Sequence, residues 1–229
     1  MLAANKNMKY TSILFLLSFF LFTSCEKSSD EEILWWHAAD IVELDASNYE
    51  LSIIDTSVTG NFIKFSFSEG DTVSHENWDV AFRGTTLIVN GGEKANVDQP
   101  DRTGNAAIYI EIGSMSEIGS VDTSKLLQDN GSGSAILNNI MIDDLGVSGQ
   151  GWASYSFSTH LFSPRAGRIL VFRTHDDKYA KMEIIYFYDS LNPDTGNGDI
   201  GGYYTFNYVY QSDEGLVFKR RNNNKVGAL

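Results

Sequence analysis

Alternation of apolar and polar side chains with a period of two residues restricts the fold of this sequence more than any other feature. In one segment, apolar Ile63, Phe65 and Phe67 alternate with polar residues. Successive side chains of a β-strand point to opposite faces, so this pattern predicts a strand with one buried and one exposed face. A helix would instead repeat its apolar positions every three to four residues.

The same alternation recurs in two longer segments near the C-terminus. Every second residue from Ala180 to Tyr188 is apolar, and every second residue from Tyr204 to Tyr210 is aromatic. Both segments are therefore predicted to be strands. We interpret the aromatic row as part of the core rather than as a ligand platform, because large aromatic side chains are usually buried.

Shorter segments complete the prediction of secondary structure. Residues 86–89 and 169–172 are continuously apolar, which is typical of strands covered on both faces. Clusters of Gly, Asn, Asp and Ser between the segments indicate turns. One helix is expected, with two turns over residues 123–129 and a Ser or Thr cap. The sequence therefore predicts an all-β body with few short helices.

The N-terminus has the features of a bacterial lipoprotein signal. The apolar run at residues 13–22 is too short to cross a membrane but suits the core of a signal peptide. Small residues and Cys25, the single cysteine, follow it and resemble a lipobox. We therefore expect a signal peptide over residues 1–24, starting at Met1 or Met8, and a lipid on the Cys25 thiol. An ordinary secretory signal with a chance cysteine is the alternative.

The segment after Cys25 is acidic and is expected to be a tether. Residues 26–32 are rich in Asp and Glu and resemble the surface-export signal of Bacteroidetes lipoproteins, with a plain solvated linker as the alternative. We assign the tether to residues 25–40, one β domain to residues 41–218, and a flexible basic tail to residues 219–229. The lipid would anchor the protein in the outer membrane, facing the cell exterior.

Charge and composition exclude several classes of function. The chain has 229 residues and a net charge of −13, which argues against a nucleic-acid partner, because such proteins need a basic surface. The single cysteine excludes an internal disulfide and a Cys-rich zinc or iron–sulfur site. No catalytic constellation stands out, so we do not expect an enzyme. Residues 196–201 match the dinucleotide motif G-x-G-x-x-G but precede a predicted strand, and we interpret them as a hairpin loop.

The four histidines are the candidate metal or cofactor ligands. His160 lies in a largely apolar segment and is the best candidate, with a packed, hydrogen-bonded histidine as the alternative. His175 lies in a predicted turn and is expected to be solvated. His37 falls in the predicted tether and His75 in a loop. No two histidines have the close spacing of zinc ligands, so a zinc site would need residues from distant parts of the sequence to converge.

Several motifs together resemble one family. Asn-Trp-Asp-Val-Ala-Phe-Arg at residues 77–83 precedes Asn-Gly-Gly at residues 90–92. The second half of the chain continues the resemblance with Gly151-Trp152, Ser163-Pro164 and the segments 168–174, 177–184 and 204–211. These motifs are similar to those of the HmuY-like haem-binding lipoproteins of the Bacteroidetes.

The resemblance covers about residues 41–211 and implies a largely antiparallel, two-sheet β fold. It also implies a surface lipoprotein that binds haem b and delivers it to a TonB-dependent outer-membrane receptor. His160 and Met141 are the candidate axial ligands of the haem iron, and Arg165 or Arg83 would contact a haem propionate. The alternative is the same fold with a non-haem ligand, or with a structural or partner-binding role beside a transporter.

Overall fold

The computed structural model describes residues 36–51, 58–133, 141–142, 149–189, 193 and 201–218. All of them fall within the compact unit Glu32–Leu229. The all-β prediction is confirmed, because the described residues form sixteen strands and a single short 3-10 turn. In this part of the chain no helix has the length and apolarity to cross a membrane.

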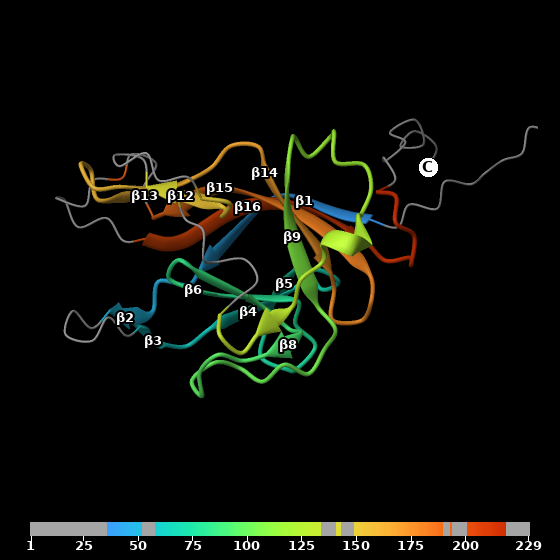
Figure 1. Cartoon of the computed structure of the whole chain (residues 1–229), viewed down its shortest axis with the longest axis horizontal. Coiled ribbons are helices and arrows are strands. Elements are labelled where there is room, and N and C mark those ends of the chain that lie inside the picture. The colour runs from blue at the N-terminus through green and yellow to red at the C-terminus, as the bar shows by residue number, and fades with distance from the viewer. Residues whose placement is uncertain are drawn as a thin grey trace, which may run out of the picture. The chain divides into compact units, whose positions relative to one another are not determined.

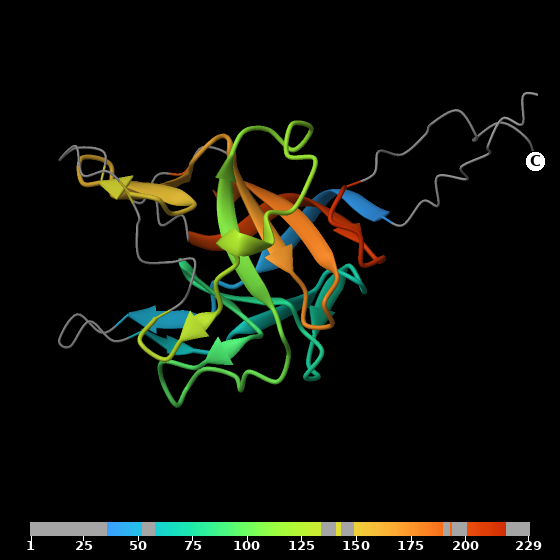
Figure 2. The same cartoon turned by 45° about the vertical axis from the view of Figure 1, so that its right-hand side comes forward.

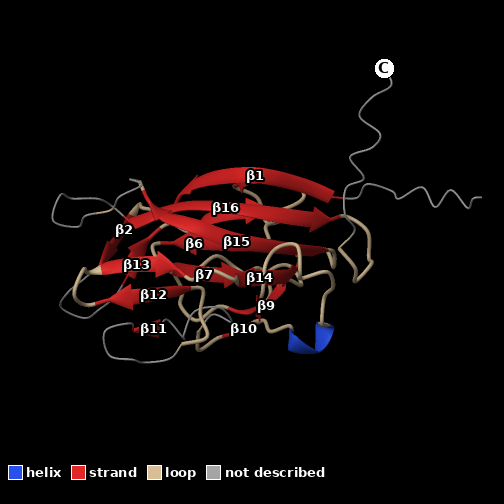
Figure 3. Ribbon diagram, turned by 90° about the horizontal axis from the view of Figure 1, so that it is seen from above, coloured by secondary structure: helices blue, strands red, loops and turns tan. Residues whose placement is uncertain are grey.

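The larger of the two main sheets has five strands, and each pairs antiparallel with its neighbours. In spatial order they are β1 (Trp36–Asp45), β16 (Gly201–Gln211), β15 (Tyr179–Tyr188), β14 (Arg168–Arg173) and β9 (Ala107–Ile112). Figure 1 labels these strands, and Figure 3 shows β1, β16, β15 and β14 side by side from above. The predicted strands near the C-terminus are thus the centre of this sheet.

The second main sheet has four antiparallel strands. They are, in order, β5 (Asp71–Val73), β4 (Ile63–Ser66), β6 (Val80–Arg83) and β7 (Thr86–Val89). Three small sheets accompany the main ones: β11 (Met141–Ile142) with β12 (Ala153–Ser156) and β13 (Leu161–Pro164), β10 (Asp129–Asn130) with β8 (Gly92–Glu93), and β2 (Tyr49–Leu51) with β3 (Val58–Gly60). The fold is therefore largely antiparallel, as the resemblance implied.

The two main sheets share one aromatic core. Phe65 of β4 packs edge-to-face on Phe206 and Tyr208 of β16, with ring centroids 5.3 and 5.7 Å apart. Phe82 of β6 stacks on Phe206 at 5.9 Å. Each such pair adds about 0.5–1.5 kcal/mol beyond the burial of its area. The aromatic row of β16 is therefore core, as predicted.

The continuously apolar segments are covered on both faces, also as predicted. On the far face of the five-stranded sheet, Ile169 and Val171 pack with Val121 and Phe218. Residues 169–172 are all buried. Strand β7 likewise buries Ile88 on the side away from the main core. Segments outside the two sheets thus cover faces that would otherwise expose apolar surface.

The helix predicted over residues 123–129 is wrong. Only a 3-10 turn forms, at Thr123–Lys125, and its cap is Asp122 rather than a Ser or Thr. Leu127 instead exchanges two backbone hydrogen bonds with Ile108 at the edge of the five-stranded sheet. Pairing with that edge satisfies the backbone groups that a second helical turn would have used.

The predicted tether overlaps the first strand. Strand β1 begins at Trp36, which is paired with Gln211, so residues 36–40 belong to the sheet rather than to a linker. Residues 36–40 join the sheet by backbone hydrogen bonds to the edge of β16. Such bonds require no alternation of side chains, so the sequence gives no sign of them. The signal peptide, Cys25, the acidic segment and the basic tail lie outside the described residues and remain predictions.

The G-x-G-x-x-G match lies between two antiparallel neighbours. Strand β15 ends at Tyr188 and β16 begins at Gly201, the last glycine of the match. The motif therefore leads into a strand and not into the helix that a dinucleotide site requires. The other residues of the match, 196–200, lie outside the described part of the chain.

Candidate functional site

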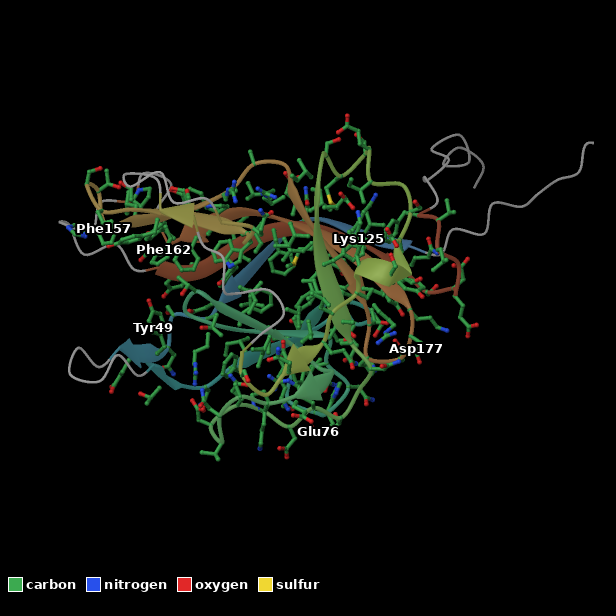
Figure 4. The ribbon with its side chains drawn as sticks, in the orientation of Figure 1. Tyr49, Glu76, Lys125, Phe157, Phe162 and Asp177 are labelled. Carbon is green, nitrogen blue, oxygen red and sulfur yellow. The ribbon has the colours of Figure 1, made fainter. Side chains whose placement is uncertain are left out.

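The β12–β13 hairpin carries His160. Ser156 pairs with Leu161, which leaves a four-residue loop, Phe157–His160. His160 ends this loop with a φ of 58°, in the left-handed region, where histidine is tolerated better than most residues. Figure 2 shows the yellow hairpin extending to one side of the main sheets, and Figure 4 labels Phe157 and Phe162 on it.

The hairpin presents an imidazole beside aromatic rings. Nδ1 of His160 lies 3.1 Å from the Tyr155 hydroxyl, and both side chains contact solvent. The Tyr155 ring packs edge-on against Phe157 at 5.1 Å and tilted on Phe162 at 4.7 Å. Phe157 is 49% exposed. Within the described residues Nε2 of His160 has no hydrogen-bond partner, so this nitrogen is available to a ligand.

The base of the hairpin is fixed to strand β15. The Phe162 amide donates to the Tyr188 hydroxyl at 2.8 Å, and Phe162 also meets the Phe187 ring at 6.1 Å. Trp152, just before β12, is buried against Phe187 at 5.5 Å. Burial raises the pKa of Tyr188, so its hydroxyl stays neutral. The imidazole is thus displayed by a loop on a rigid support.

Phe187 reaches this position through a β-bulge. A register shift between Ile184 and Tyr186 breaks the alternation that the sequence shows from Ala180 to Tyr188. Phe187, which that alternation would turn outward, is only 1% exposed. An extra residue in one strand shifts the following side chains to the other face.

Met141 lies in the same small sheet as the hairpin. Strand β11 runs parallel to β12, with Met141 opposite Ser154 and Ile142 opposite Tyr155. Adjacent residues of a strand alternate between faces, so position 142, and not position 141, shares a face with Tyr155. The structure therefore places Met141 in the strand next to β12, and His160 in the loop that joins β12 to β13.

Arg165 lies at the base of the hairpin, beyond the strand that begins after His160. Its Nη1 donates to the Gly149 carbonyl at 2.6 Å, and its amide donates to the Trp152 carbonyl. Burial first, and the charge of Arg165 second, lower the pKa of Arg168. A backbone hydrogen bond of 3.2 Å from the Arg168 amide to the Arg165 carbonyl also links these two residues.

Arg83 interacts with residues in another part of the fold. It is buried in the four-stranded sheet, where its guanidinium pairs with Asp98 and lies over the Phe62 ring at 4.2 Å. We therefore retain Arg165 and not Arg83 as the predicted anion contact of the hairpin.

His175 is not the solvated turn residue that the sequence predicted. Its side chain is 16% exposed, and its Nδ1 bonds to Oδ1 of Asp79, which is fully buried. This hydrogen bond is the main reason that the pKa of His175 is raised above its usual value, and burial opposes it. Asp79 belongs to the Asn-Trp-Asp motif. That motif is the sequence signal that could have indicated a buried partner for His175.

The Asn-Gly-Gly part of the signature is also structural. Oδ1 of Asn90 accepts hydrogen bonds from the amides of Thr103 and Gly104, at 2.7 and 3.1 Å. A Cβ added at Gly91 would lie 2.0 Å from the Ala106 carbonyl oxygen, so only glycine fits there. Both halves of the signature therefore hold chain segments together rather than face a ligand.

Asp79, His175 and Asp176 are the one trio of metal-ligating side chains that the described residues bring within reach of a common ion. Both carboxylate oxygens of Asp79 already accept hydrogen bonds, one of them from the Phe67 amide at 2.7 Å. The trio is therefore explained by the hydrogen bonds and ion pair that hold the His175 turn against Asp79.

Two hollows lie away from the hairpin tip. One, of about 790 Å³, lies on the four-stranded sheet and includes Phe62, Lys64 and Pro100 in its wall. Another, of about 360 Å³, is lined by Leu44 and Tyr204 among others. Neither of these two hollows includes His160, which is exposed.

Three solved structures are similar to this chain, and each covers 77% of it. A lipoprotein from Bacteroides fragilis NCTC 9343 is 16% identical, with a TM-score of 0.42 and 92% of its own chain covered. An HmuY-like haem-binding protein from Bacteroides vulgatus ATCC 8482 is 12% identical, with a TM-score of 0.44 and 93% covered. The apo HmuY analogue of Tannerella forsythia is 10% identical, with a TM-score of 0.43 and 98% covered.

No curated protein matches this sequence. The sequence model described as HmuY protein matches residues 59–208, which is more than half of the chain. The matched region includes both main parts of the motif pattern, from the Asn-Trp-Asp segment to the aromatic row of β16. The chain therefore belongs to the HmuY family.

Proposed function

We propose that this protein binds haem b at the β12–β13 hairpin and delivers it to a TonB-dependent outer-membrane receptor. The observation that carries the proposal is the exposed His160 imidazole, with Nε2 free among the described residues, beside the exposed Phe157 ring. Membership of the HmuY family, a family of haem-binding lipoproteins, supports the same ligand.

The residues of the hairpin fit the chemistry of haem. Haem presents a flat apolar ring, an iron that takes imidazole or thioether ligands, and two carboxylates. His160 offers the imidazole and Met141 the thioether, while Phe157 and Tyr155 offer aromatic surface. Arg165 offers a guanidinium group with donors beyond the one that binds Gly149, which suits a propionate.

The start of β1 and the support of the hairpin lie at opposite ends of the five-stranded sheet. The chain enters the sheet at Trp36, opposite Gln211, and β1 ends at Asp45, opposite Tyr203. The Phe162 amide of the hairpin donates a hydrogen bond to Tyr188, which lies at the same end of the sheet as Tyr203. Ten residues of strand span about 33 Å. With Cys25 lipidated in the outer membrane, we propose that the protein faces the cell exterior.

The first experiment is a haemin titration of the chain without its signal peptide, followed by absorbance in both redox states. We expect a saturable 1:1 shift of the Soret band. His160→Asn should weaken binding at least about tenfold and change the spectrum, because asparagine tolerates the left-handed backbone but offers no imidazole. His75→Asn is the matched control, since His75 is a partly exposed histidine outside the hairpin.

The outcomes separate the possibilities. Haemin binding that neither variant changes would overturn the assignment of His160. A change in the reduced spectrum of Met141→Ala would support Met141 as the second ligand. No Soret shift beyond that of a non-binding protein would favour the second candidate, the same fold with another ligand or a partner-binding role. The observation that favours this candidate is the hollow of about 790 Å³ on the four-stranded sheet, which His160 does not line.

A further inference from the structure

The side chain of Tyr155 lies beside that of His160, and several contacts fix the position of Tyr155. Its ring lies between Phe157, at 5.1 Å, and Phe162, at 4.7 Å, and Phe162 is also its partner across the β12–β13 ladder. The hairpin register therefore determines where the hydroxyl group lies. That group is 3.1 Å from Nδ1 of His160.

We propose that Tyr155 is a positioning residue of the haem site, a role that rests on the proposed function. Its hydroxyl oxygen accepts a hydrogen bond from Nδ1–H of His160. A neutral imidazole carries one N–H and one lone pair, so a proton held on Nδ1 leaves the lone pair on Nε2. Nε2 is the nitrogen without a partner among the described residues, and it is then the atom that ligates iron.

Two constraints together orient the imidazole. The left-handed backbone at the end of the four-residue loop directs the side chain of His160, and the Tyr155 hydroxyl fixes the rotation of its ring. Metal-bound histidines generally donate a hydrogen bond from the N–H of their second ring nitrogen to an acceptor. This bond sets the tautomer and strengthens the metal bond.

The direction of the hydrogen bond can be tested without haem. Nitrogen-15 NMR of the haem-free protein reports which imidazole nitrogen of His160 carries the proton at a pH where the ring is neutral. We expect the proton on Nδ1, and a mixture of tautomers in Tyr155→Phe. Tyr179→Phe, a change in a strand of the main sheet, should leave His160 unchanged. A proton on Nε2 in the unmodified protein, or no effect of Tyr155→Phe, would overturn the proposal.

A second measurement tests the consequence for haem. Tyr155→Phe should still bind haemin but release it about tenfold faster than the unmodified protein or Tyr179→Phe, with a shifted spectrum of the ligated iron. An unchanged rate and spectrum would refute the positioning role. Loss of the ligated spectrum in Tyr155→Phe but not in His160→Asn would also refute it and identify Tyr155 as the ligand. If the unmodified protein binds no haemin, the proposed function fails, and the NMR result still decides the hydrogen bond.

Discussion

Asp79 and His175, 96 residues apart in the sequence, are joined by two hydrogen bonds of 2.8 Å each. Oδ1 of Asp79 accepts from both the backbone amide and Nδ1 of His175. Asp79 directly precedes strand β6, and His175 lies in the turn between β14 and β15. The other carboxylate oxygen accepts from the Phe67 amide at 2.7 Å. The aspartate of the family signature therefore braces the two main sheets against each other.

Replacing this carboxylate should destabilise the fold. We expect Asp79→Asn to lower the free energy of unfolding by about 2–4 kcal/mol. The NH2 group of asparagine would replace one carboxylate oxygen and place a donor opposite a donor in a buried site. Urea unfolding measures the change. Asp101→Asn is the control, since Asp101 is exposed and its pair with Lys94 contributes little. Equal losses in the two variants would contradict the role of Asp79.

The His175–Asp79 pair predicts a dependence of stability on pH. The hydrogen bond to Asp79 raises the pKa of His175 above the usual 6.5, and Asp176 and Glu69 add to the effect. The folded state thus holds this proton more tightly than the unfolded state. The resulting stabilisation is present in full below about pH 6.5 and is lost as the pH rises through the raised pKa.

Urea unfolding between about pH 5.5 and 9 should show this loss. His175→Gln should remove it, whereas His160→Asn should keep it, because that variant retains the pair with Asp79. The comparison concerns the slope with pH and not the absolute stability, which His175→Gln also lowers. The same slope in His175→Gln and in the unmodified protein would rule the pair out as its source.

The signature glycine is predicted to be irreplaceable on steric grounds alone. A methyl group at Gly91 would lie 2.0 Å from the Ala106 carbonyl oxygen, whereas the nearest atom to one at Gly119 lies 3.9 Å away. We expect Gly91→Ala to destabilise by about 3 kcal/mol or more and Gly119→Ala to have little effect. Thermal unfolding compares them, and similar melting temperatures would disprove the close approach.

The exposed ring at the hairpin tip should matter for the ligand and not for folding. Phe157 is 49% exposed, so Phe157→Ala should change the free energy of unfolding little. With haem bound at this hairpin, we expect the affinity of Phe157→Ala for haemin to be about tenfold lower than that of the unmodified protein, because an aromatic contact surface is lost. Haemin titration measures the change. Val97→Ala, at a side chain that is 95% exposed, is the control, and an equal affinity in both variants would place haem elsewhere.

Much of the fold could be predicted because its signals are local. Residues 86–89 were predicted as a strand and form β7, and the alternation that ends at Tyr210 marks β16. The helix over residues 123–129 failed, because a sheet edge outcompeted a weak helical signal. The tether predicted over residues 25–40 overlaps β1 for a related reason, since pairing with an edge leaves no period in the sequence.

The candidate site was only partly predictable. His160 is chosen as the candidate ligand because an imidazole in an apolar segment is unusual, but its contact with Tyr155 depends on the hairpin register and loop length. The bulge in β15, which turns Phe187 inward to support the hairpin, has no signature in the alternation of its strand.

The sequence by itself determined the all-β character, most of the main strands and the family, because each rests on patterns between near neighbours in the chain. Only the tertiary structure decided which distant groups meet. A buried carboxylate such as Asp79 needs donors, but any segment that folds against it can supply them. The choice of His175 for Asp79 is a property of how the sheets pack, and that packing is set by the whole core at once.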